Sequence, residues 1–178
     1  MTRRWRLDTD RRAGQRGQAL VETALVLPIV VMLVMGLFDL GRGVYAMSAV
    51  SNAAREGART AIVNQVDADV RGRAAAQATA LGIDATLATT QANCPAPPHS
   101  LLMTPAGASG VCVQFLSHDL TAACAASASY GCIAVVTVKS TYVPLTPLLS
   151  QVVGSVPVIS RAQQPVESVC TTGTCPVP

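Results

Sequence analysis

The chain has 178 residues, half of them hydrophobic and only 13% charged, and its formal net charge is +3. The basic residues gather at the N-terminus: residues 1–17 carry six arginines against Asp8 and Asp10, a net of +4, whereas the rest of the chain carries seven basic and eight acidic side chains. A nucleic-acid-binding protein needs a basic face on its folded domain, and this distribution excludes one.

The N-terminal segment combines a glycine, a glutamate and a long uncharged stretch. Glu22 lies five residues after Gly17, and the next sixteen residues, 23–38, contain no charge. This predicts a membrane span over about 20–43, with the arginine-rich leader cytoplasmic and the rest of the chain exported. Ordinary anchors avoid such a glutamate, because an acid near the bilayer centre costs about 2.5 kcal/mol or more. The pattern resembles a type IV prepilin signal, with cleavage between Gly17 and Gln18.

Two other interpretations of the N-terminus stay open. The leader and span could form an uncleaved anchor with its N-terminus in the cytoplasm. A secretory signal could instead end at the small-x-small site Val44-Tyr45-Ala46, although the helical pattern runs straight through that site.

One long helix is expected over residues 18–64, because no strong helix stop occurs there and Pro28 should kink the helix without ending it. At 1.5 Å per residue it would be about 70 Å long, roughly twice the hydrocarbon core of a bilayer. Its second half, 44–64, must therefore lie in water or against protein. The small or apolar residues expected on one side of that half are Val44, Met47, Ser51, Ala54, Ala58, Ala61, Ile62 and Gln65.

Ala53, Gly57 and Ala61 form a ridge of small residues at four-residue spacing in the same half. Such a ridge lets another helix approach closely. It could equally pack on the sheet of its own chain, and the sequence does not decide between the two.

A second helix is expected over 67–81, with acidic residues in its first turn and Gly82 as its C-terminal cap. Strands are expected at 111–115, 132–142 and 156–163, loops at 91–110 and 117–131, and a turn at 144–149. The strand at 132–142 is the clearest, because it alternates Cys132, Ala134, Val136, Val138 and Tyr142 with Thr137, Lys139 and Thr141. The fold class is therefore α+β, with a small antiparallel sheet after two helices.

All six cysteines follow the predicted span, where an exported domain would meet an oxidising compartment. Six cysteines allow fifteen pairings. Local spacing favours Cys124–Cys132 and Cys170–Cys175, which leaves Cys94–Cys112. A zinc site is the weaker alternative, because no Cys-x-x-Cys occurs and only His99 and His118 could assist.

Several segments occur together in a characteristic order. They are the residues 16–28 (Arg-Gly-Gln-Ala-Leu-Val-Glu-Thr-Ala-Leu-Val-Leu-Pro), Phe38-Asp39-Leu40-Gly41-Arg42, Asn52-Ala53-Ala54-Arg55-Glu56-Gly57-Ala58-Arg59 and Pro144-Leu145-Thr146-Pro147-Leu148-Leu149. The chain resembles the TadE-like family, minor pseudopilins of the tight-adherence (Flp-type) pilus system. The resemblance is specific from Gly17 to about Ala61 and looser over 132–163.

The resemblance implies cleavage by a prepilin peptidase and a part in pilus assembly together with other pilins. It implies that Gly17 is the scissile position, that Gln18 is the new N-terminus and that Glu22 pairs with the ammonium of a neighbouring subunit. The sequence has no Gly-x-Ser-x-Gly elbow, no acid–His–Ser arrangement and no phosphate-binding glycine loop, so we expect no enzymatic activity, cofactor, metal or small-molecule substrate. The alternative to a pilin is an uncleaved single-span binding module. The expected organisation is a leader (1–17), a long helix (18–64), an exported α/β domain (65–165) and a C-terminal tail (166–178), located in a bacterial cytoplasmic membrane and in the pilus.

Overall fold

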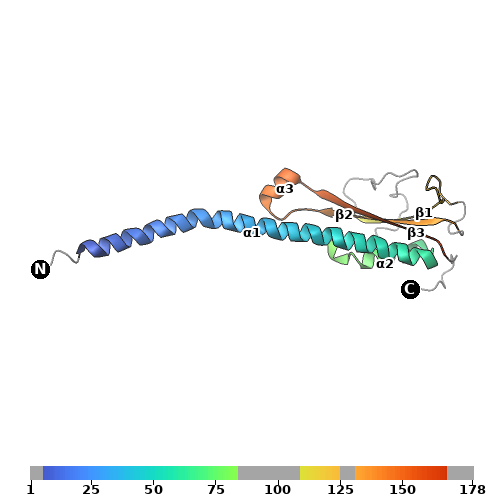
Figure 1. Ribbon diagram of the computed structural model, residues 1–178, viewed down its shortest axis with the longest axis horizontal. Coiled ribbons are helices and arrows are strands. Elements are labelled where there is room, and N and C mark those ends of the chain that lie inside the picture. The colour runs from blue at the N-terminus through green and yellow to red at the C-terminus, as the bar shows by residue number, and fades with distance from the viewer. Residues whose placement is uncertain (1–5, 84–108, 125–130, 168–178) are drawn as a thin grey trace.

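The computed structural model describes residues 6–83, 109–124 and 131–167, with side chains from Gly17 onward (Figure 1). A single long helix, α1, runs the length of the molecule, and the other elements pack along its C-terminal half. In chain order the elements are α1 (Arg6–Val63), α2 (Asp67–Ala76), a 3-10 helix η1 (Thr79–Leu81), β1 (Gly110–Leu116), β2 (Ile133–Tyr142), α3 (Pro147–Val153) and β3 (Val156–Pro165). The described strands form one antiparallel sheet in the order β1-β2-β3. The predicted fold class is confirmed.

Helix α1 contains Pro28 without being ended by it, as expected, but begins at Arg6 instead of near Gln18. The helix extends into the leader because arginine, leucine, alanine and glutamine there all favour helix, and the two leader glycines do not outweigh them. At its other end Asn64, which is fully buried, accepts a hydrogen bond from the Val66 backbone N–H (2.8 Å) and donates one to Asp69 Oδ2 (2.9 Å). These two bonds fix the corner between α1 and α2.

The small-residue ridge on α1 packs inside its own chain. Ala53 and Ala61 are fully buried, and a Cβ added at Gly57 would lie 2.9 Å from both Ala74 Cβ of α2 and Val136 Cγ1 of β2. Both partners that the sequence left open are therefore present in this chain, a helix on one side and the sheet on the other. Small side chains are required because three backbones meet here at close range.

Val44 and Met47 were expected on the packed side of α1, and this is wrong: each is 60% exposed. The buried stripe is instead made of smaller residues, beginning at Ala46 and continuing through Ala49 and Val50. The reason is the same close approach of sheet and helix, which admits alanines and excludes longer side chains.

The second helix ends earlier than expected, at Ala76, and a 3-10 turn follows before Gly82, which caps it in the left-handed conformation at φ 68°. The three strands match their predicted positions to within two residues at each end. The inward face of β2 is confirmed by the buried core cluster, which contains Cys132, Ala134, Val136 and Val138. The opposite face, expected to point outward, is buried as well, including Thr137 and Lys139.

The turn expected at 144–149 is wrong in its second half, where the chain forms the helix α3. Thr146 is the N-cap and Pro147 the first helical residue, a position that suits proline. The Thr146 hydroxyl makes no capping hydrogen bond and donates to the Asp39 carboxylate instead. The apolar pattern Leu-Leu-x-x-Val-Val is by itself too short to distinguish a helix from a turn.

Cys124 and Cys132 form a disulfide, as local spacing predicted. Cys112 is also disulfide-bonded. Its expected partner, Cys94, lies outside the described residues, as do Cys170, Cys175 and His99.

Candidate functional site

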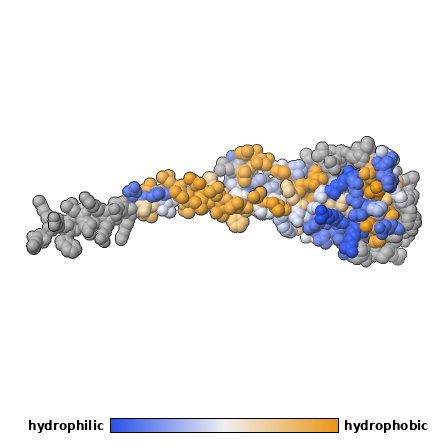
Figure 2. Space-filling view, viewed as in Figure 1, coloured by the Kyte–Doolittle hydropathy of each residue, from blue (hydrophilic) through white to orange (hydrophobic). Residues whose placement is uncertain are grey.

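Between Glu22 and Asp39, α1 exposes an apolar surface that no charged residue interrupts. The large side chains from Leu20 to Met47 are between 44% and 71% exposed, and Figure 2 shows this surface as a continuous hydrophobic segment between the leader and the packed domain. The helix is long and apolar enough to cross a membrane. An apolar surface of this extent is far larger than a water-soluble monomer exposes.

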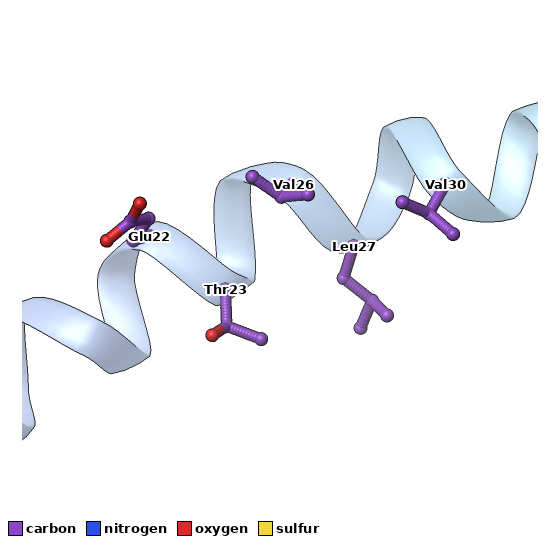
Figure 3. Close-up of a pocket in the computed structure, with 5 residues that line it drawn as sticks. All are labelled: Glu22, Thr23, Val26, Leu27 and Val30. Atoms are coloured by element: carbon purple, nitrogen blue, oxygen red, sulfur yellow. The ribbon is translucent and has the colours of Figure 1, made fainter.

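Glu22 lies at the N-terminal border of that surface. Figure 3 shows it on α1 with Thr23, Val26, Leu27 and Val30, which line the same pocket on the helix surface. The Thr23 hydroxyl is already satisfied, since it donates to the Ala19 carbonyl (2.8 Å). Glu22 is exposed and, within the described residues, has no hydrogen bond or ion pair. Nothing among the described side chains, which begin at Gly17, therefore occupies its carboxylate.

Gly17 lies inside α1, which passes through this position without a break. A Cβ added at Gly17 would meet nothing within 4 Å, so packing within the described chain does not require glycine there. Gln18 follows as an exposed helical residue. The predicted scissile bond is therefore at the surface of the helix, and the fold gives no packing reason for the glycine.

Asp39 marks the other border of the apolar surface and is 5% exposed. Its carboxylate accepts hydrogen bonds from the backbone N–H groups of Leu145 (2.9 Å) and Thr146 (2.8 Å) and from the Thr146 hydroxyl. The Tyr142 hydroxyl donates to the Asp39 backbone carbonyl at 2.7 Å. The Tyr142 hydroxyl also donates to the Asp39 carboxylate at 3.4 Å. A buried carboxylate with four donors is satisfied, so Asp39 joins α1 firmly to the start of α3.

Arg42 completes this junction from the solvent side. It is about half exposed, its guanidinium lies 4.0 Å from the Asp39 carboxylate, and it sits 5.9 Å from the centre of the Tyr142 ring. Because the guanidinium is half exposed and 4.0 Å from the carboxylate, the ion pair contributes little, while the ring contact adds a cation–π attraction.

The sequence points to both halves of this junction without joining them. Residues 38–42 and 144–149 are each characteristic segments, but their contact across more than 100 residues is not predicted by either pattern. Two sequence features could have indicated the contact. Asp39 is an acid at the end of an uncharged segment, and Thr146-Pro147 is a typical helix start whose free N–H groups can be bonded by a carboxylate from elsewhere in the chain. Among the described residues, no group of three or more histidine, cysteine or acidic side chains could hold a metal ion.

The structure thus defines a class: proteins with one helix long and apolar enough to cross a membrane, and a small α+β domain packed on the end of the same helix. The family model described as TadE-like protein matches residues 17–59, which include Gly17, Glu22, Asp39 and most of the small-residue ridge. This confirms the resemblance over about a quarter of the chain. The family is associated with Tad (Flp-type) pili and is generally non-enzymatic. Neither the comparison with curated proteins nor that with solved structures gave a match.

Proposed function

We propose that this protein is a minor pilin or pseudopilin of a tight-adherence pilus. It is inserted with its leader in the cytoplasm, cut between Gly17 and Gln18 by a prepilin peptidase, and then takes part in pilus assembly with other pilins. The observation that carries the proposal is Glu22, exposed and without a partner among the described residues, at the border of an apolar helix and within the segment that matches the TadE-like family.

Cleavage after Gly17 is chemically reasonable because the helix is easily opened there. Glycine stabilises a helix by about 1 kcal/mol less than alanine does, and Gly14 lies one turn earlier in the same leader. The missing side chain at Gly17 leaves the scissile peptide accessible once the helix unwinds. No contact inside the described chain competes for this residue.

Cleavage would also create the partner that Glu22 lacks in the described part of the monomer. The new ammonium at Gln18 lies four residues, about 6 Å along the helix axis, from Glu22. In a bundle of such helices the ammonium of one subunit can reach the carboxylate of the next, and a low-dielectric surrounding strengthens that attraction. Loss of one member would leave the other unpaired, at a cost of about 3–5 kcal/mol.

The test is Glu22→Ala, with Glu56→Ala as the matched control on the exported half of α1. We expect Glu22→Ala to be cut after Gly17 and to keep its Cys124–Cys132 disulfide, but to lose co-purification with other pilins. Glu56→Ala should leave cleavage and co-purification unchanged. Normal piliation with Glu22→Ala would show that this glutamate is only an interfacial acid.

The alternative is an uncleaved anchor for an exported binding module. It is favoured by one observation, the continuity of α1 through Gly17 into the leader. Trp5 is the only tryptophan and lies in the leader, so tryptophan fluorescence distinguishes an uncleaved protein from a processed one. Tryptophan emission from the purified native protein would support the anchor, and its loss would support processing.

A further inference from the structure

We propose that α3 and the residues before it bind the outer surface of the membrane, as a second lipid contact beside the span. The surface concerned, here called the α3 patch, consists of Val143, Leu145, Leu149, Val152 and Val153. The inference needs the membrane span but not the pilin function, so a chain that is never cut would show it as well.

The α3 patch is apolar, exposed and free of charge. Val152 is 84% exposed, Leu145 69%, and the other members of the patch between 38% and 54%. No charged residue occurs between Lys139 and Arg161. In Figure 2 the hydrophobic surface of α3 lies beside the apolar part of α1, whereas the hydrophilic surface is concentrated at the opposite end of the domain.

The depth of the α3 patch follows from its attachment to Asp39. From Glu22 to Arg42, the next exposed charge on α1, there are twenty residues, or about 30 Å of helix, which equals the thickness of the hydrocarbon core. Asp39 lies one turn before Arg42 and is bonded to the backbone N–H groups of Leu145 and Thr146. The start of α3 is therefore held level with the last turn of the span.

The side chains around this level suit a membrane interface. Arg42 and Tyr45 are 52% and 57% exposed, and both types favour the headgroup region, where an apolar stem or ring can lie beside a polar end. Asp39 itself would be costly in lipid, but its carboxylate is buried against α3 and fully hydrogen-bonded. The domain thus covers the one charge that would otherwise face the acyl chains.

Lipid is the occupant that these observations favour over a second protein. The α3 patch lies at the depth of the last turn of the span and is apolar like the surface of α1 in the bilayer. It contains no charged side chain that would select a protein partner. Its apolar residues can enter the headgroup and acyl boundary in the way that short interfacial helices do.

The test places a single tryptophan at chosen depths in the full chain, reconstituted in vesicles. In a Trp5→Phe background, Val152→Trp reports on the α3 patch. Leu33→Trp lies in the middle of the span, and His118→Trp lies beyond the distal end of β1, about 30 Å along the sheet from Tyr142. The vesicles contain phospholipids brominated on their acyl chains, which quench tryptophan on contact.

We expect Val152→Trp and Leu33→Trp to lose most of their emission to the brominated lipid, and His118→Trp to keep its emission. Unquenched, water-like emission from Val152→Trp would overturn the inference. The inference would also be overturned if the emission of Val152→Trp shifts further to the blue at higher protein density and is not quenched by the brominated lipid. A second protein would then cover the α3 patch. If Leu33→Trp is not quenched, the predicted membrane span is wrong, and so is the inference, because it needs the span.

Discussion

The substitution Gly57→Ala tests whether the small-residue ridge is packed inside the chain. The added Cβ would lie 2.9 Å from Ala74 Cβ and 2.9 Å from Val136 Cγ1, distances that real side chains do not adopt. Ala74 Cβ cannot rotate away, since it is fixed to the backbone of α2, and the χ1 of Val136 is stiff. The neighbouring elements must therefore move apart.

Two opposing effects, overpacking and helix propensity, set the change in the free energy of unfolding. Overpacking of this kind costs about 1–3 kcal/mol, and both clashes here involve rigid atoms, which places the cost in the upper part of that range. Alanine gains about 1 kcal/mol over glycine in a helix interior. We expect a net loss of about 1–2 kcal/mol, which lowers Tm by roughly 4–16 °C in a domain of about 100 residues.

Thermal unfolding of the detergent-solubilised full chain, followed by circular dichroism, measures the effect. Gly72→Ala is the matched control, because Gly72 lies within α2 and a Cβ added there meets nothing within 4 Å. The control should keep the gain in helix propensity and raise Tm. If Gly57→Ala raises Tm as much as the control does, the ridge is not packed in the monomer and must face a partner.

Two further predictions concern the junction and the disulfide. Asp39→Asn should lower stability by about 2 kcal/mol and expose the chain around α3 to proteases, because an amide replaces the charged acceptor of the Leu145 and Thr146 N–H groups. Arg42→Gln alters only a 4.0 Å ion pair made by a half-exposed guanidinium and a ring contact, and should change stability by less than about 1 kcal/mol. Removing the Cys124–Cys132 bond by a double Cys→Ser change should cost about 2–3 kcal/mol in the loop-entropy account, measured as a fall in Tm. An unchanged Tm in either the Asp39 or the cysteine variant would contradict its prediction.

Local sequence signals predicted most of the fold. The uncharged segment and the alternation along β2 each define their element through a short-range preference that the final structure keeps. Gly82 caps a 3-10 turn and not the longer helix that it was expected to end. The Cys124–Cys132 disulfide was predictable for the same reason, since its cysteines lie only eight residues apart.

Features that depend on distant contacts were not predictable. The exposure of Val44 and Met47 follows from where the sheet meets α1, and α3 depends on a carboxylate contributed from position 39. The ridge illustrates the same limit: its spacing indicated close packing, but only the fold identifies Ala74 and Val136 as the neighbours.

The mature N-terminus tests the central claim most directly. Trypsin cuts after Arg16 and Arg42, so the uncleaved protein yields the peptide 17–42. A protein cut by the prepilin peptidase yields 18–42, shorter by one glycine. Mass spectrometry of the native protein should find the peptide that begins at Gln18 and none that begins at Gly17. Recovery of 17–42 together with leader peptides from residues 1–16 would contradict the account.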